Sequence, residues 1–185
     1  MELDGDRNWL GGVRRVPSPN CDERPAGTRI SLIVVHGISL PPGEFGGPWI
    51  DDLFCNRLDP AAHPCFAAIA GLRVSSHLLI RRGGEITQYV GLQQRAWHAG
   101  QSCFQGRSAC NDFSIGIELE GTDELPYTDP QYERLAALVG LLCRAFPDLT
   151  PERVVGHCDI APGRKTDPGP AFDWSELRRR LEPIS

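Results

Sequence analysis

The sequence predicts an α+β fold in which a mixed central β-sheet is flanked by helices. Short apolar runs rich in β-branched residues recur along the chain, beginning with residues 30–35. A strictly alternating segment at 114–120 and an amphipathic segment after residue 128 add a strand and a helix. Strands with helices between them favour a sheet covered by helices. We expect residues 1–185 to form one domain.

The first third of the chain combines a lead-in with one buried strand. Residues 1–29 are rich in Arg, Pro, Gly and Asn, and we expect them to pack on the core. The run 30–35 is predicted to be a buried strand with His36 at its end. Residues 37–48 are too rich in Gly and Pro for regular structure, and loops of this length are usually functional. Residues 49–58 are predicted to form a short helix.

The middle of the chain contains three predicted strands. Residues 75–80 and 85–90 flank the sequence Arg-Arg-Gly-Gly at 81–84, which is typical of a hairpin turn. Residues 91–112 are predicted to be irregular. In the strand 114–120, side chains alternate between two faces. One face carries Ile115, Ile117 and Leu119, and the other carries Gly116, Glu118 and Glu120.

The last third begins with the clearest helix. Thr128 and Gln131 fit a capping box, apolar residues then recur every three or four positions, and Pro147 stops the helix. Residues 154–157 are predicted to form a short strand that ends in His157. A loop over 158–173 is followed by a final basic helix that opens at 173–176 and runs through 178–180.

Composition excludes several classes of function. The 185-residue chain has a formal net charge of -5, so it lacks the basic character of a general nucleic-acid binder. No apolar run approaches the roughly 20 residues that span a bilayer, so we expect no membrane insertion. Seven cysteines, an odd number, indicate reduced thiols. Residues 1–6 are acidic and no apolar segment follows them, so we expect a cytoplasmic protein without a secretory signal.

Two histidines and one aspartate form a candidate metal site. His36 and His157 each follow an apolar β-branched run, and Asp167 lies ten residues after His157. This spacing lets a loop return its carboxylate to the histidine, and Pro-Gly-Pro at 168–170 would stiffen the return. Hydrolytic zinc usually has three protein ligands and one open position. No short-spaced pair such as HExxH is present, so spacing alone does not establish zinc. Cys158 is an alternative ligand, but we expect it to pack.

A hydrolase with such a metal also needs a proton carrier and a positive charge. Glu118 is the candidate base, with Gly116 leaving room beside it, and Glu120 on the same face competes for the role. A strand carboxylate that simply faces solvent is the commoner case. Lys165, two residues before Asp167, is the candidate for stabilising an oxyanion, although Arg164 is an equally available cation.

Four side chains are candidates for holding a substrate. The guanidinium groups of Arg73, Arg107 and Arg164 could pair with peptide carboxylates. The ring of Trp97 could lie against a sugar. Most surface arginines are only solvated and most tryptophans belong to a core, so residue type alone is a weak indication here.

Several segments together resemble the zinc N-acetylmuramoyl-L-alanine amidases, which share their fold with peptidoglycan-recognition proteins. The resemblance covers nearly the whole chain, from residues 14–19 to 172–174. Segments 39–49 and 110–113 are most similar to the cytosolic branch that acts on 1,6-anhydro-N-acetylmuramyl-L-alanine muropeptides. The segments that carry the resemblance are 34–36, 75–77, 96–100, 111–120 and 156–170.

This resemblance implies a function and a set of roles. It implies a Zn²⁺ cofactor on His36, His157 and Asp167, a general base at Glu118 and oxyanion support from Lys165. The substrate would be a small muropeptide, cut between the lactyl group of anhydro-muramic acid and L-alanine. The products would be recycled, and muropeptides that induce β-lactamase would fall. The alternatives are an envelope or lytic amidase that acts on intact peptidoglycan and a peptidoglycan-binding module without catalysis.

The sequence departs from the family at two positions. Gly37 follows the first predicted ligand, where relatives carry Asn. Ala109 stands where some relatives have Arg, so peptide recognition would depend more on Arg73 and Arg107. Neither departure affects the predicted metal ligands.

Overall fold

A six-stranded mixed sheet lies at the centre of the computed structural model, which describes residues 1–181. The β4–β5 pair is antiparallel and the other neighbours are parallel, which confirms the predicted mixed sheet. From edge to edge the strands are β1 (Arg14–Arg15), β5 (Ile86–Gln88), β4 (Leu78–Ile80), β9 (Ser114–Glu120), β3 (Leu32–Ile38) and β10 (Val154–Gly156).

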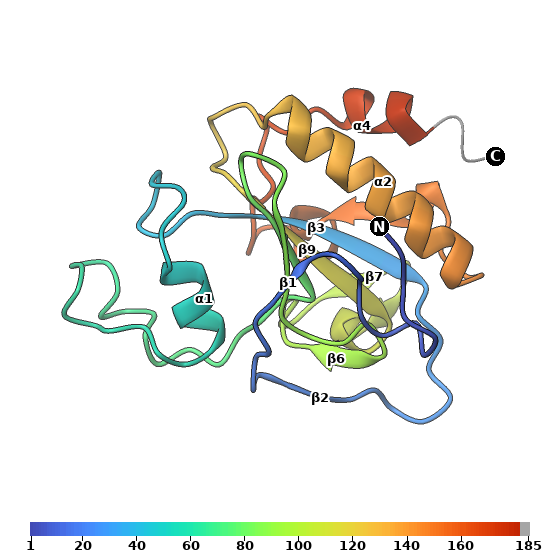
Figure 1. Cartoon of the computed structure of the whole chain (residues 1–185), viewed down its shortest axis with the longest axis horizontal. Helices are drawn as coiled ribbons and strands as arrows, with labels where there is room; N and C mark the ends of the chain where they lie inside the picture. Colours follow the sequence, from blue (N-terminus) through green and yellow to red (C-terminus); the bar gives the residue numbers. More distant parts are fainter. Residues whose placement is uncertain (182–185) are drawn as a thin grey trace.

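One face of the sheet is covered by two helices, α2 (Asp129–Ala145) and α4 (Trp174–Leu181), which run across the top of Figure 1. The predicted capping box of α2 is present, because the Thr128 side chain accepts the Gln131 N–H and the Gln131 side chain bonds the Thr128 N–H. Alternate β3 and β9 side chains pack under these helices and form the main core: Ile33, Val35, Ile115, Ile117 and Leu119.

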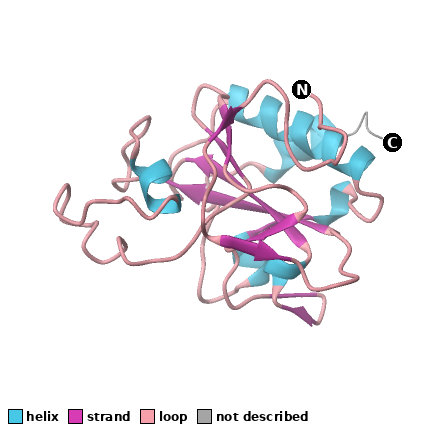
Figure 2. Cartoon of the chain, turned by 60° about the horizontal axis from the view of Figure 1, so that its bottom comes forward, coloured by secondary structure: helices cyan, strands magenta, loops and turns pink. Residues whose placement is uncertain are grey.

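The opposite face is covered mainly by loops and short elements, which surround the sheet in Figure 2. Because side chains alternate along a strand, this face receives the even-numbered residues of β3 and β9. Leu32 and Val34 pack here with Phe113 and Ile160 in a smaller core. The covering elements are α1 (Trp49–Phe54), α3 (His157–Ile160), the two-stranded sheets β2 (Cys21–Glu23)–β6 (Gln94–Ala96) and β7 (Cys103–Phe104)–β8 (Arg107–Ser108), and two 3₁₀ turns, Cys110–Asp112 and Pro151–Arg153.

Several predicted boundaries differ from the observed ones. The helix predicted over 49–58 ends at Phe54, and the predicted hairpin pairs only residues 78–80 with 86–88. Residues 91–112, predicted to be irregular, contain β6, β7 and β8. Strand β6 pairs with β2, which is about 70 residues away, so a local sequence pattern does not predict this strand. Within residues 1–181, none of the helices combines the length and apolarity needed to cross a bilayer.

His157 does not end a strand, contrary to the sequence prediction. Strand β10 stops at Gly156, and His157 is the first residue of the short helix α3. The Asp159 carboxylate accepts the Gly156 N–H at 2.7 Å, which caps the start of this helical turn. The imidazole is therefore held at a helix start beside the end of β3.

Candidate metal centre and active site

The register of β3 and β9 places His36 directly beside Glu118. The two strands are parallel, so paired residues project from the same face of the sheet. Both side chains are almost fully buried, with His36 2% and Glu118 7% exposed. Two residues that are 82 positions apart in the sequence thus share one small region under the covering loops.

His36, His157 and Asp167 converge on one point, as the sequence predicted. Nδ1 of His36 lies 3.0 Å from Nδ1 of His157 and 3.2 Å from Oδ2 of Asp167. The third side of the triangle, from His157 Nδ1 to Asp167 Oδ2, is 3.1 Å. A backbone hydrogen bond from Cys158 N to Asp167 O, 3.0 Å long, brings the loop back to the helix start. These three residues form a group that could hold a metal ion.

The donor atoms fit a small divalent cation. Ligands about 2.0–2.1 Å from a tetrahedral zinc ion are separated from one another by about 3.3 Å, close to the sides of this triangle. Nε2 of His157 faces the Ala99 carbonyl at 3.2 Å, and a carbonyl only accepts hydrogen bonds. His157 therefore carries its proton on Nε2 and turns a bare Nδ1 lone pair toward the carboxylate. A bound cation would balance these converging lone pairs.

The electrostatics of the cluster favour the protonation states that bind metals. Burial lowers the pKa of His36 to about 4, so its imidazole is neutral at pH 7. Burial alone would raise the pKa of Asp167, but its close contacts with the rings of His157 and His36 hold it well below its usual value. Neutral imidazoles beside an ionised carboxylate are the forms in which these residues coordinate zinc.

Glu118 and Glu120 project from the same face of β9 but have different neighbours. The Glu120 carboxylate accepts hydrogen bonds from Arg81 Nη1 at 2.6 Å and from the Gly46 N–H at 2.7 Å. It therefore anchors the loop that follows β3, which begins after Ile38 rather than at residue 37 as the sequence predicted. The Glu118 carboxylate has no hydrogen-bond partner among the described residues. Its burial, together with the nearby Asp167, raises the pKa of Glu118 well above the usual value, although Lys165 opposes the shift.

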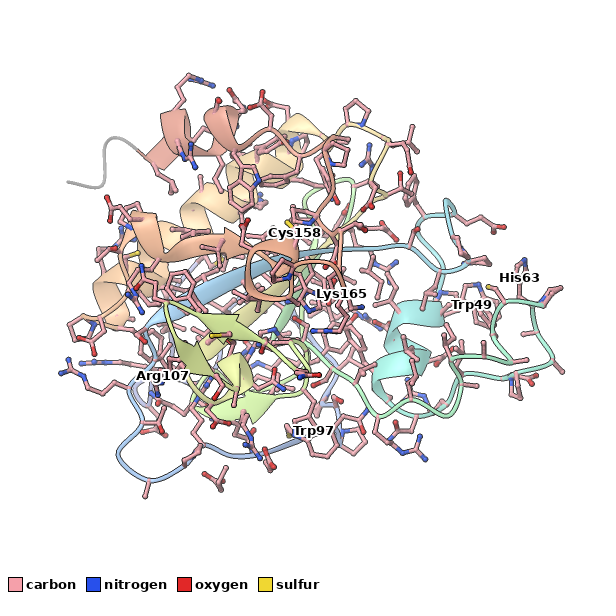
Figure 3. All side chains as sticks on the ribbon, turned by 180° about the vertical axis from the view of Figure 1, so that it is seen from behind. Trp49, His63, Trp97, Arg107, Cys158 and Lys165 are labelled. Atoms are coloured by element: carbon pink, nitrogen blue, oxygen red, sulfur yellow. The ribbon has the colours of Figure 1, made fainter. Side chains whose placement is uncertain are left out.

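Lys165 and Arg164, the two candidate cations, also differ. The Arg164 guanidinium donates to the Ala99 carbonyl at 2.7 Å and to the Gln101 carbonyl at 2.6 Å, so it is held by the backbone. Lys165 is exposed, and its charge acts on both Glu118 and His36. Figure 3 shows it near the middle of the loop-covered face, below Cys158. Lys165 is therefore the cation whose charge acts on Glu118, whereas Arg164 is held by backbone carbonyls.

Comparison with known proteins identifies the family. The family model described as N-acetylmuramoyl-L-alanine amidase matches residues 26–170, a span that contains the whole cluster and Glu118. The chain belongs to this amidase family. This amidase is 64% identical over 173 residues to the 1,6-anhydro-N-acetylmuramyl-L-alanine amidase AmpD of Escherichia coli, with 94% of each chain covered.

Two solved structures are similar to this amidase. A crystal structure of an AmpD derivative has a TM-score of 0.94 and 61% identity, and covers 98% of this chain and 99% of that chain. The Escherichia coli amidase AmiD, in complex with the substrate anhydro-N-acetylmuramic acid-L-Ala-D-γ-Glu-L-Lys, has a TM-score of 0.61 and 30% identity. That match covers 85% of this chain and 60% of that chain. These likenesses agree with the predicted family and fold.

The four predicted substrate-binding residues have different neighbours in this amidase. Arg73 is exposed and donates to Asn56 Oδ1 at 3.3 Å. The half-buried Trp97 donates its indole N–H to Asp22 Oδ1 at 3.1 Å. The exposed Arg107 lies over the Phe113 ring, with its guanidinium carbon 3.8 Å from the ring centroid. Figure 3 shows Trp97 near the bottom of the molecule and Arg107 higher and to the left. Arg164 is tied most directly to the cluster, because it shares the Ala99 carbonyl with His157.

The structure also explains Gly37, one of the two departures from the family. A Cβ atom at this position would lie 2.4 Å from the hydroxyl oxygen of Tyr127. The Tyr127 hydroxyl donates to the Pro168 carbonyl at 2.9 Å, next to Asp167. Gly37 thus leaves the space in which Tyr127 supports the loop that carries a cluster residue. The sequence prediction did not include Tyr127. The feature that points to it is the missing side chain at Gly37, which is 90 positions away in the sequence.

Proposed function

We propose that this amidase uses one Zn²⁺ ion, held by His36, His157 and Asp167, to hydrolyse muropeptides that carry 1,6-anhydro-N-acetylmuramic acid. The bond cut is the amide between the lactyl group of the sugar and L-alanine. The observation that carries the proposal is the triangle of donor atoms, with sides of 3.0–3.2 Å, beside the buried Glu118, which has no hydrogen-bond partner within residues 1–181. The name of the Escherichia coli relative and the substrate bound to AmiD support the choice of substrate.

The chemistry divides among the residues of the site. Zinc bound at this cluster would polarise the amide carbonyl and lower the pKa of the attacking water. The Glu118 carboxylate accepts a proton from that water as the new C–O bond forms. It then donates the proton to the amine of L-alanine as the C–N bond breaks. Glu118 is placed for this exchange, because its buried carboxylate lies in register beside His36 and has no hydrogen-bond partner within residues 1–181.

Lys165 acts on the charge that the reaction creates. Negative charge develops on the amide oxygen as water attacks, and a positive side chain at that oxygen stabilises the transition state. We assign this role to Lys165 because Arg164 is occupied by two backbone carbonyls. Arg73, Trp97, Arg107 and Arg164 remain our candidates for contacts with the peptide and the sugar.

The biological setting follows from the substrate. Cleavage would release the peptide and the anhydro-sugar for reuse and would lower the muropeptides that induce β-lactamase. We propose a cytoplasmic location, which is supported by seven free cysteine thiols in the described chain. Fractionation of cells that express a tagged protein would test this, and recovery from the periplasm would contradict it.

One experiment tests the function as a whole. Purified protein is analysed for zinc and then assayed on an anhydro-muropeptide and on whole sacculi, before and after chelation. We expect about one zinc per chain, rapid release of free peptide from the anhydro-muropeptide, and loss of activity on chelation that added zinc restores. Activity on sacculi alone would favour an envelope or lytic amidase. Binding of the muropeptide without cleavage by zinc-loaded protein would favour a binding module.

A further inference from the structure

A chain of buried hydrogen bonds leads from Nε2 of His36 to the protein backbone. It starts at the ring nitrogen that does not face His157 and Asp167. Nε2 of His36 lies 2.9 Å from Nδ1 of His98, and Nε2 of His98 lies 3.1 Å from the Ser114 hydroxyl. The Ser114 hydroxyl lies 2.6 Å from the Cys110 carbonyl oxygen. His98 is 9% exposed and Ser114 is fully buried, so water does not interrupt the chain.

The Cys110 carbonyl, at the end of this chain, fixes the direction of every hydrogen bond in it. The Cys110 carbonyl can only accept, so the Ser114 hydroxyl donates its proton there. The Ser114 oxygen is then an acceptor for an N–H on Nε2 of His98. A neutral His98 with its proton on Nε2 presents a lone pair on Nδ1, which accepts the Nε2–H of His36. His36 is thereby left with a bare lone pair on Nδ1, the atom that points into the cluster.

The opposite arrangement is unfavourable. If His98 donated from Nδ1 to His36 while still donating to Ser114, it would be a charged imidazolium. The ring nitrogens of His98 contact only His36 and Ser114 among the described residues, so such a charge would be buried without a carboxylate partner. Burial of an unpaired charge is costly, and the neutral form is therefore favoured.

The surrounding backbone is shaped to hold His98 in this place. Gly116 lies under the His98 ring, and a Cβ atom there would be 2.5 Å from the ring. The Asn111 side-chain oxygen accepts the backbone N–H groups of His98 at 3.1 Å and of Ala99 at 2.7 Å. The same segment therefore supports both cluster histidines, since the Ala99 carbonyl accepts from His157.

We propose that His98 and Ser114 are positioning residues that set the tautomer and orientation of His36 for metal binding. Neither residue belongs to the group of three that could hold the metal. The inference rests on the proposed function, because it assumes that His36 is a zinc ligand. Partners that orient a ligating histidine typically change metal affinity by about 10–100-fold when they are removed.

The test measures the zinc Kd by competition with a chromophoric chelator, together with thermal unfolding of the metal-free proteins. Ser114→Ala should weaken zinc binding by about 10–100-fold. Ser18→Ala is a matched control, because Ser18 is also buried, donates to a carbonyl (Phe54) and accepts a backbone N–H (Asn20), but lies outside the chain. We expect the control to bind zinc as the wild type does.

A second pair of variants separates hydrogen bonding from packing. Asn and Leu have similar branched shapes, but the Oδ1 atom of Asn replaces Nδ1 of His98 as an acceptor. We expect the zinc Kd of His98→Asn to be lower than that of His98→Leu by at least about tenfold. Equal zinc Kd values for these two variants, or equal losses in Ser114→Ala and Ser18→Ala, would overturn the inference. Failure of the wild type to bind zinc would instead overturn the metal assignment on which the inference rests.

Discussion

Replacing Glu118 by glutamine should nearly abolish turnover while the protein keeps its zinc. Gln has the shape of Glu but cannot shuttle a proton, and removal of a general acid–base typically costs 10²–10⁴-fold in rate. At about 1.36 kcal/mol per tenfold, this corresponds to about 2.7–5.4 kcal/mol of transition-state stabilisation. Glu120 cannot replace it, because Arg81 and the Gly46 N–H hold that carboxylate. The assay is chromatographic measurement of kcat on an anhydro-muropeptide, with zinc content measured in parallel.

The same substitution should stabilise the metal-free protein at neutral pH. Burial raises the folded-state pKa of Glu118 above its usual value of 4.5, so the folded state binds a proton more tightly than the unfolded state. The free energy of unfolding then falls as pH rises from about 4.5 toward the folded-state pKa, by about 1.4 kcal/mol for each unit of pKa shift. Glu118→Gln removes this loss of stability. Urea unfolding should therefore show a higher free energy of unfolding than the wild type at pH 7, and the difference should disappear below pH 4.5.

Glu120→Gln provides the matched control for this prediction. It changes the same residue type on the same face of β9, but it weakens a buried pair with Arg81 and should lower stability at pH 7. Wild-type kcat in Glu118→Gln would refute the assignment of the base. A loss of stability at pH 7 in metal-free Glu118→Gln would refute the argument that burial of its carboxylate is unfavourable.

Three further perturbations test other parts of the site. Asp167→Ala should weaken zinc retention, and an unchanged zinc content by elemental analysis would argue against Asp167 as a ligand. Lys165→Ala should lower kcat by about 10²–10³-fold at full zinc content, and a wild-type kcat would remove Lys165 from the mechanism. Gly37→Ala should lower the free energy of unfolding by about 1–3 kcal/mol, because its Cβ atom would be 2.4 Å from the Tyr127 hydroxyl. In a Tyr127→Phe background, Gly37→Ala should lower the free energy of unfolding, measured with urea, by a smaller amount. An equal decrease in both backgrounds would contradict this explanation.

Predictions from the sequence succeeded where the signal is local. The strand 114–120 was placed at its observed boundaries because strict alternation needs only seven neighbouring residues. The start of α2 was placed because Thr128 and Gln131 are three positions apart and bond each other's backbone. Predictions failed where pairing is distant, as in β6, and where a turn changes direction at one residue, as at His157.

The sequence by itself determined the fold class, the family and three candidate metal ligands. The side chains of these three residues lie together in the described part of the chain. Strand periodicity did not separate Glu118 from Glu120, since both are glutamates on one face of one strand, and the choice of Glu118 rested on the family resemblance. The tertiary structure separated them, because Arg81 lies beside Glu120, whereas Glu118 is paired in register with His36. Likewise, the roles of His98 and Ser114 depend on hydrogen bonds between segments that only folding brings together. Periodicity and capping are encoded within a few residues, whereas the proton positions of a site depend on contacts between distant ones.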